Sequence, residues 1–575
     1  MADLEVFASI PAHPFWGQVA EQIDFSFADT LCAPLYSPLG QRPFAPSLKL
    51  KIHLVQRYYD LSDRGIEERI IGDLFIKRFL GIPVAHPGID HSTIALDRFR
   101  LGGELFHACH HFILAQALEK KLWGDKQDRW LVDAFHTYAN ISIPTTYRLI
   151  QQGILRLIRH LKRKYPSFYE ALKQHVDIGA MLKRLAPRLG ETERLIAFSK
   201  LVAHAYALLY AIEGPQLASL FWNWSNSREQ LVSLELQALL IRILMENAKS
   251  AETMDNKPPS SDAAVPSTEL KQEETTSAST ETPPPSVEAK ETTAQATVEY
   301  VLNDASLKDR IVSAFDPDAR FGSKSASVKF VGDKVQLVES AQCRLILNAE
   351  PFAGNESDAD SLVAVQIDIV DRHGVRPKET VADAVYGYAR SRLAMAERNM
   401  PLTTPLAVHA NPTGLYDQSA FRYDASIDKM ICPAGNESKR VHSIAKSEGK
   451  QYVFDKACCA LCPKREQCTT SQKTGRTVFV SDHQPMYDAA RAYNESEAGK
   501  EALQTRYEIE RTNNEMKNHH GLKRPRTRGR KALRVSVKLT IMVINLKTIV
   551  KACGTKVTGF LRRTCRKRNK AFVCP

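Results

Sequence analysis

Apolar residues recur at helical spacing through the first part of the chain, including the stretch LSDRGIEERIIGDLFIKRFLG. The apolar positions of this stretch are Ile66, Ile70, Ile71, Leu74, Phe75 and Phe79. Gly81 and Pro83 predict the end of the helix, and Ser92 is the expected cap of a second helix in DHSTIALDRFR. We therefore predict a helical N-terminal domain over residues 1–125.

A short run of β-branched and aromatic residues from Trp130 to Tyr138 predicts a strand, which Pro144 ends. The segment from Tyr147 to Tyr165 then places apolar residues on one side and basic residues elsewhere, as in an amphipathic helix. Its basic side fits a phosphate backbone or an ordinary solvated helix face equally well. Because the helical pattern continues to about Asn247, we predict a helical insertion over residues 145–248.

The composition changes abruptly after this insertion. Residues 249–296 are rich in Pro, Ser, Thr, Glu and Ala, as in TETPPPSVEAKETT. Such a segment cannot bury enough apolar surface to offset the entropy lost on ordering. We predict a disordered, acidic and Pro-rich linker.

Order returns with two strand-like runs, SASVKFVGDKVQLVE and CRLILNAE, and with a helical pattern from Asp360 to Arg372. The run ETVADA then predicts a buried strand ending at Asp383, and PLAVHAN predicts another strand. Together with the strand near Trp130, this order predicts a mixed α/β sheet, and thus an α+β fold. The segments of this core are 126–144, 310–414 and 496–552.

Charge is distributed unevenly along the 575 residues. The formal net charge is +13, and the stretch from Gly521 to Pro575 contains 17 Lys plus Arg and no Asp or Glu. This density fits a polyanion-binding surface, although a solvated, partly disordered tail has the same composition. We predict a basic tail over residues 553–575 that follows a basic helical segment. Because we find neither a signal peptide nor an apolar run of about 18 residues, we expect no membrane partner and a cytoplasmic location.

Three carboxylates stand in distinctive settings: Asp133 in VDAFHTYAN, Asp383 in VADAVYG and Glu510 in RYEIERTNNEMK. Three converging carboxylates can hold two Mg²⁺ or Mn²⁺ ions, because these metals prefer oxygen ligands, and a metal pair drives in-line displacement at phosphorus. Taken singly, an Asp near a strand end is more often a cap or turn residue. Nearby candidates for the place of Asp383 are Asp358, Asp360 and Asp371.

The third carboxylate has cations at helical spacing. On one continuous helix Arg506, Glu510 and Lys517 would fall within roughly 40° of one another, so that one face presents a metal ligand and two phosphate contacts. A solvated ion-pair helix would explain a single pair equally well. His519 and His520 follow and are expected on the surface. The predicted DNA contacts are Arg506, Lys517, Arg526 and Arg528.

Cysteines cluster within a second predicted insertion, residues 415–495, which holds five of the 11 cysteines of the chain. The predicted ligands of a structural Zn²⁺ ion are Cys432, Cys459, Cys462 and Cys468. A C-x2-C pair with two further thiolates suits tetrahedral zinc. Cys458 is a substitute for Cys459, and the competing interpretation is a set of reduced cysteines without metal.

Nearly the whole chain resembles bacterial insertion-sequence transposases with an RNase H-like core and an Asp-Asp-Glu triad, in particular their large cysteine-containing subgroup. The resemblance rests on the N-terminal stretch LYSPLGQRPFAPSLKLKIHLVQRYYDLSDRGIEERI, on VDAFHTYAN and VADAVYG, and on a CP…C-x2-CP-x4-C segment. The most specific motif is Arg506, three residues, Glu510, six residues and Lys517. One departure is Leu503, where the family has a tyrosine.

The resemblance implies an enzyme that cuts DNA at the ends of an insertion sequence and transfers the strands to target DNA. It implies Asp133, Asp383 and Glu510 as ligands of two Mg²⁺ ions, an N-terminal domain that binds DNA ends, and a homo-oligomer associated with the nucleoid. Two different functions remain open: an inactive or domesticated DNA-binding protein, and a plain metal-dependent nuclease without strand transfer.

Overall fold

Strand alternation explains how the central sheet is buried on both faces. Successive side chains of a strand point to opposite faces. Leu131 and Phe135 therefore pack in one apolar core, while Trp130 and Val132 pack in another. The strands of this sheet are β1 (Arg129–His136), β4 (Arg320–Ser323), β5 (Lys329–Ser340), β6 (Ile346–Ala353), β7 (Glu379–Ala382) and β8 (Leu402–Thr403).

The sheet is mixed. Its order is β4-β5-β1-β7-β8, and β6 also pairs with β5. Strand β1 runs antiparallel to β5 and parallel to β7. The predicted succession of a strand, two more strands, a helix and two further strands is confirmed, and it is consistent with an RNase H-like core. The last strand described is Leu402–Thr403, just upstream of PLAVHAN, and most of PLAVHAN, residues 407–411, lies outside the described part.

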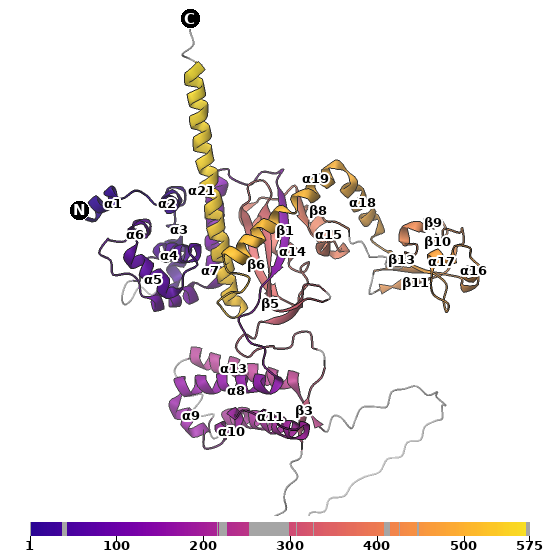
Figure 1. The fold of residues 1–575 in the computed structure, drawn as a ribbon, viewed down its shortest axis with the longest axis horizontal. Coiled ribbons are helices and arrows are strands. Elements are labelled where there is room, and N and C mark those ends of the chain that lie inside the picture. The colour runs from indigo at the N-terminus through magenta and orange to yellow at the C-terminus, as the bar shows by residue number, and fades with distance from the viewer. Residues whose placement is uncertain are drawn as a thin grey trace, which may run out of the picture. The chain divides into compact units, whose positions relative to one another are not determined.

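The computed structural model describes residues 2–36, 43–215, 217, 227–251, 298–305, 307–325, 327–406, 414–424, 426–445 and 448–570. It divides into two compact units, the first comprising Met1–Asn140 with Phe321–Pro575 and the second comprising Ile141–Arg320 (Figure 1). The predicted linker falls almost entirely outside the described residues.

Helices form the N-terminal part of the first unit. They are α1 (Ala2–Ser9), α2 (Trp16–Gln22), α3 (Phe27–Cys32), α4 (Pro46–Tyr58), α5 (Asp63–Gly72), α6 (Leu74–Leu80) and α7 (His91–Glu119). The helical pattern from Ile66 to Phe79 is thus divided in two, because Asp73 leaves the helical conformation and caps α6 by accepting a bond from Ile76 N. The cap of α7 is Asp90 rather than Ser92, since the Asp90 carboxylate accepts from the Ser92 amide.

The second unit is a helical bundle around its own apolar core. Its helices are α8 (Thr146–Lys164), α9 (Pro166–Leu172), α10 (Ile178–Leu182), α11 (Glu191–Glu213) and α13 (Ser227–Asn247), joined by a small sheet of β2 (Ala248–Ser250) and β3 (Tyr300–Leu302). Among the described helices, α11 alone is long and apolar enough to cross a membrane by length and composition. Core helices pass the same test, and Val202 and Leu208 of α11 are fully buried in this bundle.

The cysteine-rich segment has a small core of its own, formed by Phe421, Met430, Tyr452, Phe454 and Val478. Its strands are β9 (Arg422–Asp424), β10 (Lys429–Ile431), β11 (Ser438–Ile444), β12 (Gly449–Phe454) and β13 (Thr477–Ser481). Two short helices, α16 (Lys456–Ala460) and α17 (Arg465–Cys468), carry most of its thiols.

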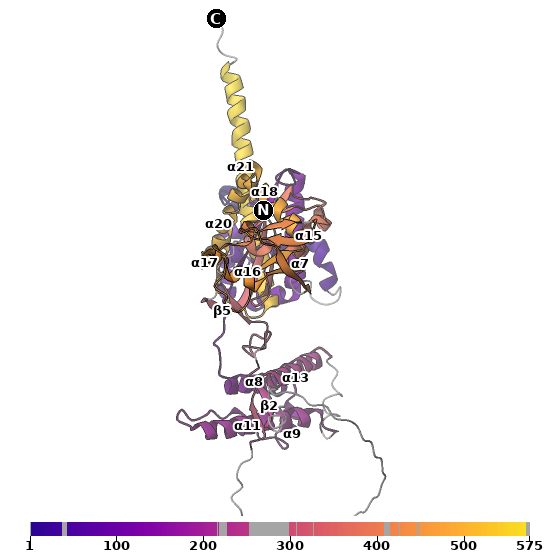
Figure 2. The ribbon, with the colours of Figure 1, turned by 90° about the vertical axis from the view of Figure 1, so that its right-hand side faces the viewer.

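The remaining helices belong to the sheet-containing unit. They are α14 (Leu362–His373), α15 (Ala389–Ala396), α18 (Gln484–Glu495), α19 (Glu497–Thr505), α20 (Glu508–Asn514) and α21 (Arg530–Lys570). Helix α14 packs on the Trp130 face of the sheet, α20 packs on the Leu131 face, and α21 contributes apolar side chains to both cores. Figures 1 and 2 show α21 as one continuous helix.

Candidate active site

The strand register places the two predicted aspartates side by side. Strands β1 and β7 are parallel, with Val132 opposite Ala382, so that the next residues along the two strands are Asp133 and Asp383. Asp133 shares the sheet face of Leu131, which α20 and α21 cover. Asp383 leaves β7 to cap a short helical turn, and its carboxylate accepts from the Ala384 amide at 2.6 Å.

Helix α20 brings the third predicted carboxylate to this face. A cleft of about 470 Å³ is lined by Asp133, Glu510 and Lys517, together with Asn513 and Asp358. The Asn513 side-chain amide donates to Asp133 Oδ2 at 2.7 Å, which fixes the orientation of that carboxylate. Asp383 is adjacent in register but does not line the cleft.

Burial raises the pKa of Asp133 to about 6, and the negative charges of Asp383 and Asp358 add to this rise, while Arg506 opposes it. The charges of Asp358, Asp133 and Asp383 also act on Tyr386, which is 1% exposed. Burial raises the pKa of Tyr386 well above its ordinary value, and the three negative charges add to the effect. Carboxylates gathered in a buried site repel one another unless a cation neutralises them, so this donor set fits divalent metal ions.

Asp358 is a cleft residue that the sequence offered only as a substitute for the second aspartate. It precedes α14 and forms an ion pair with Lys334 of β5, with Nζ 2.6 Å from Oδ1. Neither Asp360 nor Asp371 lines the cleft, because Asp360 pairs with the exposed Arg390 and Asp371 is exposed on α14. Asp358 and Lys334 are 24 residues apart in the sequence and meet only in the folded protein. A pattern within one segment of the sequence therefore cannot identify Asp358 as a cleft residue.

The prediction that Arg506, Glu510 and Lys517 share one continuous helix is wrong. Helix α19 ends at Thr505, α20 begins at Glu508, and a π-helical turn follows at Glu515–His519. A π-helical turn contains extra backbone per turn and changes the angular position of later side chains. Lys517 nevertheless reaches the cleft, whereas Arg506 lies over the Tyr507 ring at 4.6 Å and does not line it.

The π-helical turn is held by a buried polar network. His520 is 2% exposed, so the prediction of a surface position for it is wrong. Its backbone carbonyl accepts from Arg57 of α4, and Glu515 accepts from Lys547 of α21 at 3.0 Å. These contacts lower the pKa of Glu515 to about 2, mainly through the bond with His520 and also through Lys547. Lys517 is thus positioned by helices far away in the sequence.

The two predicted DNA contacts beyond this turn bind within the protein. Arg526 forms an ion pair with Asp60 at 3.0 Å, although its side chain is 67% exposed. Arg528 Nε donates to the Asn140 carbonyl at 2.9 Å. Both side chains lie in the segment that follows the cleft helix.

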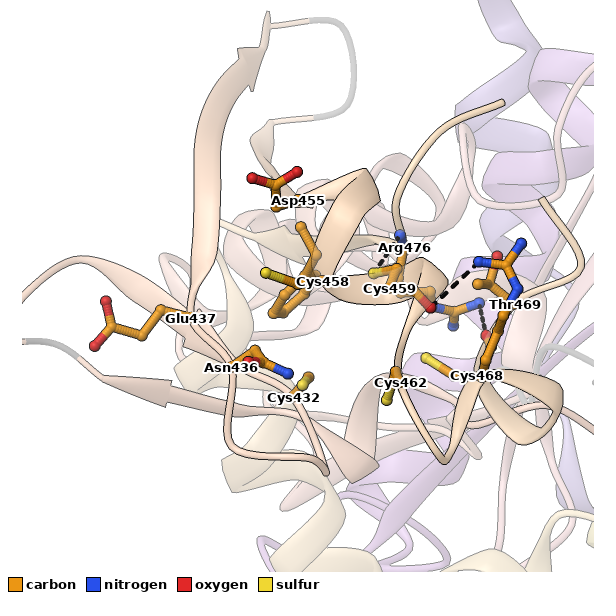
Figure 3. Close-up of a pocket in the computed structure, with 12 residues that line it drawn as sticks. Cys432, Asn436, Glu437, Asp455, Cys458, Cys459, Cys462, Cys468, Thr469 and Arg476 are labelled. Carbon is orange, nitrogen blue, oxygen red and sulfur yellow. Dashed lines mark hydrogen bonds between the residues drawn. The ribbon is translucent and has the colours of Figure 1, made fainter. Parts of the chain in front are cut away.

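The four predicted zinc ligands border one small cavity, but among the described residues they do not belong to the groups whose ligand atoms all lie within 4.8 Å of one another. The cavity has a volume of about 30 Å³ and is lined by Cys432, Cys459, Cys462 and Cys468. Figure 3 shows these side chains together with Cys458. Burial raises the pKa of Cys468, Arg476 opposes the rise, and the neighbouring Cys459, Cys432 and Cys462 add to it. The Arg476 amide donates to Cys459 Sγ at 3.5 Å. Cys458 also borders the cavity, but it is exposed and does not contribute to the pKa of Cys468.

Backbone hydrogen bonds fix the turns that carry two of these cysteines, Cys432 and Cys462. The Cys432 amide donates to Asn436 O at 2.9 Å and Gly435 N donates to Cys432 O at 2.8 Å, with Gly435 at a φ of +85° that favours glycine. The Arg465 amide donates to Cys462 O at 3.1 Å. Four free thiols around one small cavity fit Zn²⁺ by number and type.

Comparison with known families gave two matches. Residues 431–550 match the family described as transposase DDE domain, and residues 4–100 match the family described as transposase domain (DUF772). The first match includes Glu510 and the four cysteines of the cavity, whereas Asp133 and Asp383 precede it. Searches of curated proteins and of solved structures found no significant match. The chain therefore carries a transposase DDE domain over residues 431–550 and a DUF772 transposase domain over residues 4–100.

Proposed function

We propose that the protein cleaves DNA at the ends of an insertion sequence and joins the freed 3′-OH ends to target DNA in a metal-dependent reaction. The observation that carries this proposal is the parallel register of β1 and β7, which sets Asp133 beside Asp383 on the face covered by α20. Glu510 and Lys517 line the cleft on that face. A DDE domain in the same chain supports the assignment of these carboxylates as its triad.

Asp133, Asp383 and Glu510 would hold two Mg²⁺ or Mn²⁺ ions. Bound there, the metal pair would activate the attacking hydroxyl and stabilise the charge that develops on the phosphate during in-line displacement. The fit rests on the chemistry of the donors: Asp133 and Asp383 are half-buried carboxylates that repel each other, and Glu510 adds an exposed carboxylate at the cleft. The Asn513 side-chain amide donates a hydrogen bond to Oδ2 of Asp133. This bond would hold the carboxylate in a fixed orientation for binding a metal ion.

Lys517 is the cation best placed to hold a phosphate beside the triad. Burial lowers the pKa of Lys517, with Lys324 and Lys523 acting in the same direction, while Asp133 and Glu510 partly oppose the shift. Arg506 stacks on Tyr507, a residue that is 62% exposed, and could contact the DNA backbone next to the cleft. We assign Arg526 and Arg528 to the same DNA path.

Zinc would serve structure rather than chemistry. A Cys₄ site at Cys432, Cys459, Cys462 and Cys468 would stabilise a small segment whose apolar core consists of only a few side chains. We also propose that the active complex is a homo-oligomer bound to two DNA ends, located in the cytoplasm on the nucleoid.

The test is cleavage of a labelled fragment from the end of the element by Asp133→Asn, Asp383→Asn and Glu510→Gln. We expect each change to lower the cleavage rate by about two to four orders of magnitude, because metal ions supply several kcal/mol of transition-state stabilisation. Mobility-shift binding to the same fragment should persist. Asp371→Asn is the matched control, since Asp371 is an exposed carboxylate outside the cleft.

Three outcomes would contradict the proposal. Near-normal cleavage by any one of the three variants would remove that residue from the triad. Cleavage by the wild-type protein without joined products, when target DNA is supplied, would indicate a metal-dependent nuclease. Binding without cleavage at saturating Mg²⁺ or Mn²⁺ would indicate a DNA-binding protein that has lost its activity.

A further inference from the structure

A second group of ligand-type side chains lies outside the cleft, between α7 and α14. His107 and His111 stand one helical turn apart on α7 and face Asp368 of α14. The Nε2 atoms of His107 and His111 lie 3.1 and 3.0 Å from the same oxygen, Asp368 Oδ2. Both histidines are buried, with exposures of 4% and 5%.

The three candidate ligand atoms lie close enough to surround one ion after the two nitrogen–oxygen separations, 3.1 and 3.0 Å, have widened by a few tenths of an ångström. With metal–ligand bonds of about 2.0–2.2 Å, neighbouring ligand atoms in a tetrahedral site lie roughly 3.3–3.6 Å apart. Among the described residues, two groups bring three such atoms within 4.8 Å of one another. The other group, Glu67, Asp90 and His91, is at the surface, whereas this one is enclosed.

The other ring nitrogen of each histidine, Nδ1, faces a polar partner, as is usual when Nε2 binds a metal. His107 Nδ1 lies 3.6 Å from Glu350 Oε1, and His111 Nδ1 lies 2.8 Å from His373 Nε2. A histidine that binds a metal through Nε2 carries its proton on Nδ1 and donates it to an acceptor such as a carboxylate. Glu350 is itself fixed by Lys538, which is fully buried.

Without a metal the same arrangement leaves polar atoms unsatisfied. His107 Nδ1 and His111 Nε2 make no hydrogen bond of acceptable geometry, although both are buried. A neutral His107 that donated from Nε2 to Asp368 would turn the lone pair of Nδ1 toward the Glu350 carboxylate, which is unfavourable. Asp368 is held in place independently, because it accepts from Asn348 at 2.9 Å and from Arg372 at 2.8 Å.

We propose that His107, His111 and Asp368 form a binding site for one Zn²⁺ ion that fastens α7 to α14. Two imidazoles and one carboxylate are a donor set suited to zinc, and water would complete the coordination. Helix α7 belongs to the N-terminal helices, and α14 packs on the catalytic sheet. The ion would therefore link the helical region to the core that carries Asp133.

The test separates this ion from the one at the cysteines. Full-length protein purified without chelator should contain two Zn²⁺ per chain, and His111→Asn should lose one of them while the cysteine site stays filled. The control is Cys462→Ser, which should lose the other ion. Cobalt distinguishes the sites, because only thiolate ligands give intense sulfur-to-metal charge-transfer absorption. In Cys462→Ser protein loaded with Co²⁺, the remaining cobalt should lack that absorption.

His373, which contacts His111 but is not a proposed ligand, provides a test that leaves all three ligands in place. His373→Asn should weaken Zn²⁺ binding at this site by about 10- to 100-fold, the usual effect of losing such a partner, with the folded structure retained. If Cys462→Ser protein that is folded by circular dichroism binds no Co²⁺ or Zn²⁺, the proposal is overturned. Equal zinc contents of wild-type and His111→Asn protein would overturn it as well, and would leave protonated histidines paired with Asp368.

Discussion

Replacing Asp133 by asparagine should stabilise the metal-free protein even though it abolishes catalysis. Burial, together with the charges of Asp383 and Asp358, raises the pKa of Asp133 from 3.8 to about 6. Each tenfold change in an ionisation constant corresponds to about 1.4 kcal/mol, so the charged side chain costs the folded state up to about 3 kcal/mol. Asparagine has nearly the same shape, carries no charge and can still accept the bond from Asn513.

The sign of the pH dependence follows from the direction of the shift. Because the pKa is raised on folding, the folded protein binds the proton more tightly than the unfolded chain, and stability falls as pH rises from 3.8 to about 6. The advantage of Asp133→Asn should therefore grow from about 2 kcal/mol at pH 5 to about 3 kcal/mol at pH 7 and then level off. Mg²⁺ should reduce it, since the metal stabilises only the ionised wild-type site.

Urea unfolding in EDTA, followed by circular dichroism at pH 5, 6 and 7, measures this difference. The comparison uses the midpoint of the transition of the sheet-containing unit, because a protein with two compact units need not unfold in one step. Asp371→Asn should behave as the wild type at each pH. The reasoning is refuted if Asp133→Asn is no more stable than the wild type at pH 7 in EDTA, or if its advantage is the same at pH 5 and pH 7.

Three further predictions concern other parts of the molecule. Asp358→Asn should shift the acid side of the cleavage pH profile to lower pH, because it removes a negative charge that raises the pKa of Asp133, and an unshifted profile would contradict this link. Cys462→Ser should lose the zinc of the cysteine cavity while Cys458→Ser keeps it, as measured by elemental analysis. Deleting Leu561–Pro575 removes six cations and should make the slope of log affinity against log salt shallower by up to about 5, with preference for element ends unchanged.

The sequence predicted the structure well where a single helix or strand produces the pattern of apolar residues. The run near Trp130 has the β-branched and aromatic residues of a strand, and β1 occupies Arg129–His136. The amphipathic pattern from Tyr147 predicts α8, and the apolar alternation of CRLILNAE predicts β6. In each case the side chains alone determine which face is buried, so local spacing was enough.

Prediction failed where the outcome depends on contacts between distant segments. The π-helical turn after α20 is held by Arg57 and Lys547, which no local pattern connects to Glu515. The histidines of α7 meet Asp368 only after α7 and α14 have packed against the same sheet face. Residue spacing in the sequence identifies side chains that share a face of one helix or strand. These two sites combine side chains from several helices and strands, so spacing could not identify them.

The second unit, Ile141–Arg320, is inserted in the sequence between strands β1 and β5 without changing how these strands pair. Hydrogen bonds continue between the ends of β1 and β5 up to the boundary of the sheet-containing unit, from Thr137 N to Asp333 O at 2.8 Å and from Ala139 N to Val331 O at 2.9 Å. Gly332 permits this close approach, because a Cβ there would lie 2.1 Å from Thr137 O. The insertion thus replaces the loop of an antiparallel pair, and the cost of closing a loop grows only slowly with its length. The register that sets Asp133 beside Asp383 is therefore determined by the strands and not by the segment between them.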